Sequence, residues 1–176
     1  MTLALAPEWR PEIRAALPGL TLAVVTLLFG FALGIVFGLN EDAIKSRFSA
    51  SAAAVEATVY HGDPSAAKPV LEKSWSYAQR AHLHAGGLGT TAIALIVTLL
   101  LVGTAPGPTR VLSIALGIGG LGYSLFWLWA AFRAPGLGST GAAKESLAWL
   151  AMPSSGIFVV ATAVVAMLSL RATFRR

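Results

Sequence analysis

Cysteine is absent from the 176 residues of this sequence, so neither a disulfide nor a thiolate metal site can form. Any metal would need nitrogen or oxygen ligands, with methionine as a lesser option. Charged residues are also scarce, at 12% of the chain, whereas hydrophobic residues make up 56% and the mean hydropathy is +0.71. A soluble domain of this length carries more charge, so the composition predicts an integral membrane protein.

Four stretches of the sequence lack charged residues, and each is long enough for the roughly 20 residues of a membrane-spanning helix. The expected spans cover residues 16–39, 82–103, 111–133 and 146–170. We therefore expect an all-α fold, an integral membrane four-helix bundle made of two hairpins. Residues 1–176 would form a single membrane domain whose surroundings are the lipid bilayer.

Basic residues gather on one side of the expected topology. Four spans place both termini and the loop between the second and third spans on the same side. That side carries the charged residues Arg10, Arg14, Arg110, Arg171, Arg175, Arg176, Glu8 and Glu12. Because loops rich in arginine and lysine stay inside, we expect both termini in the cytoplasm of a bacterial inner membrane. Basic residues beside spans attract lipid headgroups, so the net charge of +5 does not indicate nucleic acid as a partner.

The long outer loop, residues 40–80, is expected to be partly helical. Apolar residues recur there at helical steps, which predicts an amphipathic helix, at Ile44, Phe48, Ala52, Val55 and Val59. Asn40 is a candidate N-cap for this helix, unless the first span runs straight on. Residues 60–64 read YHGDP and predict a turn, after which a helix starting near Pro69 continues into the second span. Aromatic residues fall near the outer membrane boundary, at Trp75, Tyr77, Tyr123, Trp127, Trp129 and Trp149.

Glycines in the first two spans predict a close helix contact. Three of them in the first span, Gly30, Gly34 and Gly38, are four residues apart and leave one helix face without side chains. In the second span His82, Gly86 and Gly89 also share a face, because they follow steps of four and three. These two faces would pack together as antiparallel neighbours.

Two acidic residues lie one turn beyond the first glycine face. If the glycine faces pack together, Glu41 and Asp42 reach the level of His82, and we expect a carboxylate to contact the imidazole. For all three side chains a purely structural role is the alternative. Carboxylates favour a helix N-terminus, and an imidazole at the membrane boundary can simply hydrogen-bond to a backbone carbonyl.

His84 lies two residues after His82, so on a helix the two side chains point roughly 200° apart. Either the two histidines serve separate sites, or His84 faces the third or fourth span, or a late helix start bends both inward. Imidazole and carboxylate together suit copper, zinc or iron. The candidate metal ligands are His82, His84, Glu41 and Asp42.

Residues 80–89, RAHLHAGGLG, together with GLNEDAIK at 38–45, resemble uncharacterised small four-helix inner-membrane proteins of bacteria, over most of the chain. The shorter pattern A-H-x-H followed by glycines is similar to a histidine-bearing helix in the large subunit of haem-copper oxidases. That resemblance implies haem ligation by His82 or His84. No other expected span contains a histidine, so an oxidase is excluded, and a haem held by two histidines on different helices would need a second subunit.

Two functions are therefore expected. The first is the binding of copper, zinc or haem near the outer, periplasmic face, by a protein accessory to a respiratory or metal-handling complex. The alternative is a structural subunit without a cofactor, docked in a membrane protein complex or forming a homo-oligomer. An enzyme is less favoured because no nucleophile is identified, and a transporter because no acid or base lies at mid-membrane depth.

Overall fold

The computed structural model describes residues 10–174 and is helical throughout this range apart from short connections. The elements are α1 (Pro11–Ala53), α2 (Glu56–Val59), η1 (Pro64–Ala67), α3 (Lys68–Leu101), α4 (Pro106–Leu137), α5 (Thr140–Glu145) and α6 (Ala148–Phe174). Four helices are long and apolar enough to cross a membrane, namely α1, η1 with α3, α4 and α6. The prediction of an all-α membrane four-helix bundle is thus confirmed.

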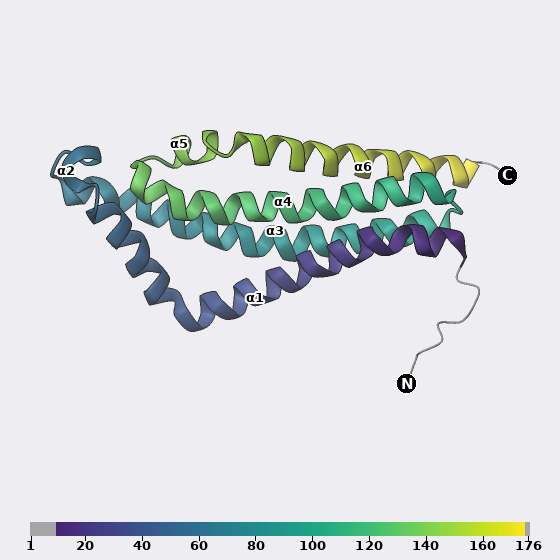
Figure 1. Ribbon diagram of the computed structural model, residues 1–176, viewed down its shortest axis with the longest axis horizontal. Coiled ribbons are helices and arrows are strands. Elements are labelled where there is room, and N and C mark those ends of the chain that lie inside the picture. Colours follow the sequence, from purple (N-terminus) through teal and green to yellow (C-terminus); the bar gives the residue numbers. More distant parts are fainter. Residues whose placement is uncertain (1–9, 175–176) are drawn as a thin grey trace.

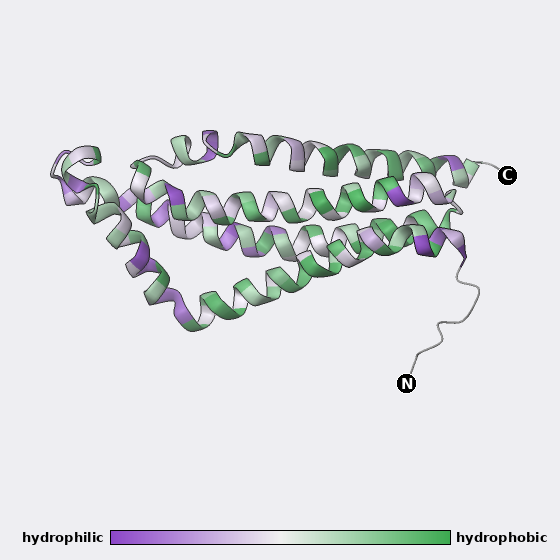
Figure 2. Ribbon diagram, in the orientation of Figure 1, coloured by the Kyte–Doolittle hydropathy of each residue, from purple (hydrophilic) through white to green (hydrophobic). Residues whose placement is uncertain are grey.

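The four long helices run side by side along the longest axis of the molecule (Figure 1). The start of α1, the connection between α3 and α4, and the end of α6 lie together at one end, and α2 and α5 lie at the other. Colouring by hydropathy shows mostly apolar helices with hydrophilic residues near both ends (Figure 2). Three residues used in the charge comparison, Glu8, Arg175 and Arg176, lie outside the described residues.

Helix α4 is the centre of the bundle, because it packs against α1, α3 and α6, whereas α6 has few contacts with α3. Glycines on different faces of α4 allow these approaches. A Cβ at Gly117 would lie 2.5 Å from Leu22 of α1, and one at Gly119 would lie 2.8 Å from the carbonyl oxygen of Ser154 in α6. Lipid tails are as apolar as the side chains, so the hydrophobic effect does not drive helices together within a membrane. Small residues favour association there because they let the backbones pack closely.

Helix α1 is longer than the expected first span and is kinked at Asn40, where φ is −132° and ψ is 26°. The Asn40 amide donates a hydrogen bond backwards to the carbonyl of Val36, at 3.2 Å, so Asn40 does not cap a new helix. The first span instead continues directly into the expected amphipathic helix, which ends at Ala53, so Val55 and Val59 lie beyond it and the predicted helix is shorter than expected. Beyond the kink, Phe48 and Ala52 are buried. In Figure 1 the two halves of α1 form a bend whose apex is spread away from α3 and α4.

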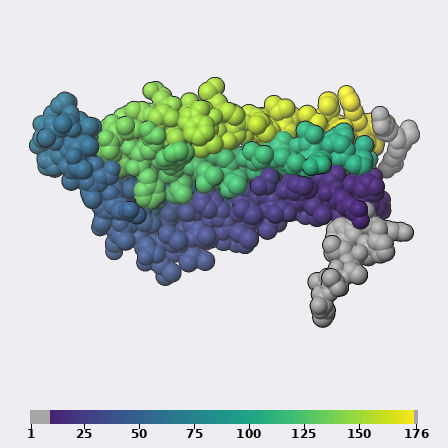
Figure 3. Space-filling view, in the orientation of Figure 1, coloured from purple at the N-terminus to yellow at the C-terminus, as the bar shows by residue number. Residues whose placement is uncertain are grey.

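The segment between α1 and α3 folds back onto the end of α4. The predicted turn is present, with positive φ angles at His61 (54°) and Gly62 (76°). The Tyr60 hydroxyl donates a hydrogen bond to the carbonyl of Pro135, at 2.7 Å. Gly138, with φ of 63°, is tightly packed against Val59. These contacts hold the segment seen projecting at one end of the space-filling view against the end of α4 (Figure 3).

Candidate functional site

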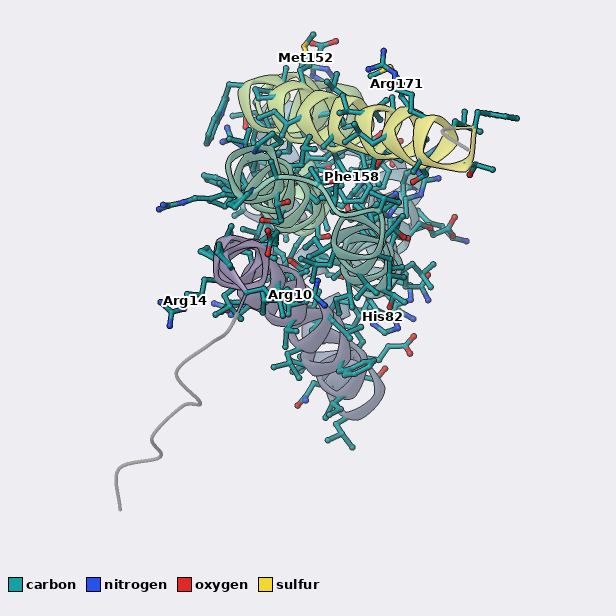
Figure 4. All side chains as sticks on the ribbon, turned by 90° about the vertical axis from the view of Figure 1, so that its right-hand side faces the viewer. Arg10, Arg14, His82, Met152, Phe158 and Arg171 are labelled. Atoms are coloured by element: carbon teal, nitrogen blue, oxygen red, sulfur yellow. The ribbon has the colours of Figure 1, made fainter. Side chains whose placement is uncertain are left out.

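His82 joins α3 to α1. Its Nδ1 lies 2.8 Å from the carbonyl oxygen of Gly30. A carbonyl oxygen only accepts, so Nδ1 carries the hydrogen, and the neutral ring keeps Nε2 as an acceptor. The side chain is half-buried and is directed from α3 toward α1, as Figure 4 shows along the axis of the bundle.

The glycines of α1 make room for this contact. A Cβ on Gly34 would lie 2.8 Å from Cε1 of His82, and one on Gly30 would lie 2.7 Å from the backbone nitrogen of Gly86. On α3, a Cβ on Gly89 would lie 2.8 Å from the backbone nitrogen of Leu27. The helices therefore meet closely along these positions, and the imidazole occupies the space that a side chain at position 34 would need.

The remaining glycines named from the sequence are not crowded. A Cβ at Gly38 or at Gly86 would meet no atom within 4 Å. Gly86 still belongs to the contact, because its own backbone nitrogen lies against Gly30. Gly38 faces open space, so the close approach of α1 and α3 ends one turn before the position that the glycine spacing suggests.

The acidic residues do not reach His82. Glu41 and Asp42 are exposed, and Glu41 pairs with Lys45 on the next turn of α1. Between residues 10 and 174, no group of three or more histidine, aspartate and glutamate side chains could hold a metal ion. The expected contact between imidazole and carboxylate is not formed.

An aromatic pair and a kink explain this difference. The rings of Phe37 on α1 and Trp75 on α3 meet edge to face, with centroids 5.4 Å apart. They fill the space between the helices just where glycine-to-glycine packing would have to continue. The kink at Asn40 then carries the following residues away in a new direction, so their position cannot be extrapolated from a straight helix.

His84 faces α4, which settles the alternatives left open by its spacing from His82. Its Nδ1 lies 2.7 Å from the carbonyl oxygen of Arg80, one turn earlier on α3. The ring meets Tyr123 edge to face, at 5.2 Å between centroids, and stacks on Trp127 at 5.8 Å with an interplanar angle of 29°. The two histidines therefore lie on different sides of α3 and cannot bind one metal ion together.

Aromatic residues around His84 form a group that we call the outer aromatic cluster. Its members are Tyr77 and His84 of α3 with Tyr123, Phe126 and Trp127 of α4. The guanidinium carbon of Arg80 lies 5.0 Å from the centroid of the Trp127 ring and 5.5 Å from that of Tyr77. Within the described chain, the buried Nε1 of Trp127 has no hydrogen-bond partner.

Sequence reasoning placed these aromatic residues at the membrane boundary but missed their role inside the bundle. Tyr77 is 1% exposed and Trp127 is 9% exposed, so both are core residues. For Tyr77 the available signal was its helical spacing, since Arg80 and His84 follow it at steps of three and four on α3. Comparison with protein-family models, with curated proteins and with solved structures found no match.

The chemistry open to the two histidines follows from these contacts. Each ring donates through Nδ1 to a backbone carbonyl and keeps Nε2, which can accept a proton or bind a metal ion. His82 or His84 could thus supply one ligand each to copper, zinc or haem iron. Further ligands would have to come from another molecule, since Glu41 and Asp42 point elsewhere.

Proposed function

We propose that this chain is an accessory subunit of the bacterial inner membrane, with both termini in the cytoplasm and no cofactor of its own. The observation that carries the proposal is the placement of the two histidines. His82 joins α3 to α1 through Gly30, and His84 packs α3 against the aromatic residues of α4. The most distinctive residues of the sequence thus act in holding three helices together.

The cytoplasmic placement of the termini is supported by the charges near that end of the bundle. Arg10, Arg14, Arg110 and Arg171 are exposed there, with Glu12 as the acidic residue among the described positions. Positive charge of this kind is retained on the cytoplasmic side during insertion. The outer aromatic cluster and the α2 segment then belong to the periplasmic side.

Helix α6 supports docking to a transmembrane helix of a larger membrane protein. It is the least buried of the four spans, at 17% of its most apolar window, against 28% to 44% for the others. Its buried residues form one narrow stripe against α4, at Ser154, Phe158, Ala161 and Val165. The remaining surface is apolar and includes Val159 and Val160, which are each more than 60% exposed.

A photoreactive residue tests this docking in native membranes. At Val160 it should crosslink to one defined partner, whereas at Leu28, equally apolar and exposed on α1, it should not. A crosslink to a second copy of the chain would identify a homo-oligomer. The same pattern at both positions, or crosslinks to lipid alone, would contradict docking through α6.

A second candidate function is the binding of copper, zinc or haem through His82. It is favoured by the hydrogen bond from Nδ1 to the Gly30 carbonyl, since metal-binding histidines commonly donate their other nitrogen to such a carbonyl. His82 would offer Nε2 to the metal. The other ligands would come from the partner complex, which would be a respiratory or metal-handling assembly.

Elemental analysis separates the two functions. Copper, zinc and iron would be measured in protein purified in mild detergent, before and after loading with copper and zinc. We expect no stoichiometric metal in the natural chain, in His82→Ala or in the control His61→Ala, which alters an exposed turn residue. Stoichiometric metal that is lost in His82→Ala and kept in His61→Ala would replace the first function with the second.

A further inference from the structure

Arg80 is held by an aromatic platform at the outer end of α3 and α4. Its guanidinium lies over the rings of Trp127 and Tyr77, at 5.0 Å and 5.5 Å from their centroids. Both rings are buried, so the platform is fixed by the core, while Arg80 itself is exposed. Attraction between a cation and aromatic rings holds the guanidinium group at this position on the surface.

Arg80 forms no ion pair with an acidic residue in the described part of the chain. The ion pair found among those residues joins Lys45 to Glu41. A guanidinium held over aromatic rings still has N–H donors that the rings do not engage. Those donors match two oxygens of one phosphate or carboxylate group. An anion from outside the described chain would find these donors accessible.

His84 stacks on the Trp127 ring over which Arg80 lies. Its Nδ1 donates to the carbonyl of Arg80, which ties the ring to the same turn of α3. With Nδ1 as the donor, Nε2 remains an acceptor, so His84 acts by holding this turn of α3 and not as a donor to an anion. The faces of the neighbouring rings are engaged with one another, as in the pairs Tyr77 with Trp127 and His84 with Tyr123. What this end of the bundle offers outward is thus the N–H groups of the Arg80 guanidinium, which suit an oxyanion better than a flat ring.

The expected position of Arg80 relative to the membrane indicates which kind of anion it would meet. It lies two residues before the expected start of the second span, among aromatic residues typical of the membrane boundary. Lipid phosphates lie at this level, and long basic side chains near helix ends reach them. We propose that Arg80, positioned by Trp127 and by the turn that His84 holds, forms a binding site for the phosphate group of an anionic membrane lipid. This site lies on α3 and α4 and does not depend on docking through α6.

Native mass spectrometry of the full chain tests the site. The protein would be mixed in detergent with equal amounts of phosphatidylglycerol and phosphatidylcholine, and the lipids retained per protein would be counted. The natural chain should retain phosphatidylglycerol preferentially. Arg80→Gln should weaken that retention about tenfold, because one charged hydrogen-bonding group is removed. Arg47→Gln makes the same change at an exposed arginine on the outer part of α1 and should retain the lipid as the natural chain does.

Three outcomes would overturn the proposal. These are equal retention in Arg80→Gln and Arg47→Gln, no preference for phosphatidylglycerol in the natural chain, and displacement of the lipid by millimolar inorganic phosphate, which would make free phosphate the ligand. Helix content and size in detergent would check folding. If Arg80→Gln does not fold, Arg80→Lys keeps the charge but loses the planar fork, and it should still retain less phosphatidylglycerol than the natural chain. Full retention by Arg80→Lys would contradict the proposed geometry.

Discussion

Replacing Gly34 by alanine would place a methyl group in the space of the His82 ring. The added Cβ would lie 2.8 Å from Cε1 of His82, a distance that carbon atoms in contact do not tolerate. The backbone of α1 is held against α3 one turn earlier by the contact of Gly30 with Gly86, so the imidazole has to move. Its hydrogen bond to the Gly30 carbonyl, 2.8 Å long, would then be lost or strained.

The magnitude can be worked from the same contacts. A hydrogen bond between membrane helices contributes about 0.6 kcal/mol on average and up to about 1.7 kcal/mol. The displaced ring also gives up part of its packing, so Gly34→Ala should have a free energy of unfolding about 1–2 kcal/mol below that of Gly38→Ala, which shares the same gain in helix propensity. Gly38→Ala is the matched control, since its Cβ would meet nothing within 4 Å. It should be neutral or gain up to about 1 kcal/mol from the better helix propensity of alanine.

Reversible unfolding in mixed micelles, followed by circular dichroism, would measure both variants. A double-mutant cycle makes the test specific to the imidazole. In a His82→Ala background the ring is gone, so adding Gly34→Ala should cost much less than it does in the natural chain. If Gly34→Ala is as stable as Gly38→Ala, or if its effect is unchanged in the His82→Ala background, then the contact of His82 with α1 is not as described.

Three further predictions concern other contacts. Gly19→Ala should destabilise the fold by several kcal/mol, about the cost of strong overpacking, because its Cβ would overlap the backbone of α4, whereas Gly107→Ala, with open space around it, should not. Tyr60→Phe should lower stability by about 1 kcal/mol and speed amide exchange at the outer end of α4, since the hydroxyl bonds a carbonyl there. Hydrogen bonds from Ser65 lower the pKa of Asp63, so the carboxylate should protect the start of η1 above its unfolded pKa of 3.8, and this protection should disappear as the pH falls through the folded value. Asp63→Ala should therefore show faster amide exchange in η1 at neutral pH.

A different result would contradict each of these three predictions. Equal stability of Gly19→Ala and Gly107→Ala would contradict the close approach of α1 and α4 at Gly19. Unchanged exchange at the end of α4 in Tyr60→Phe would show that the outer loop is not held there by its hydroxyl. An effect of Asp63→Ala that is independent of pH would mean that the carboxylate is not the group that caps η1.

Composition and periodicity were sufficient for the fold class because both express simple physical requirements. Runs without charge must be long enough to cross the bilayer, and four such runs are present as helices. The four-residue step from Phe48 to Ala52 predicted a helix with a buried face, and both residues are buried. The turn at His61 and Gly62 followed from local chemistry in the same way.

The candidate site was harder to predict because it depends on the relative direction of two helices. Spacing along the chain places residues on a face of one helix, but only while that helix stays straight. The kink at Asn40 and the pair formed by Phe37 and Trp75 are tertiary features, and they separate Glu41 from His82. The central role of α4 was missed for a related reason. Its glycines, such as Gly117 and Gly119, lie on several faces and produce no single periodic stripe.

The two histidines show how a short motif can serve two interfaces at once. Since His82 and His84 are separated by roughly 200° around α3, one ring reaches α1 and the other reaches α4. Each ring fixes its orientation by donating to a backbone carbonyl, which satisfies a polar group that would be costly to leave unpaired in a membrane. The carbonyl of Arg80 holds His84, and the Arg80 side chain covers the ring on which His84 stacks. Loss of His84 should therefore disturb the position of Arg80, whereas loss of His82 should loosen α1 and leave Arg80 in place.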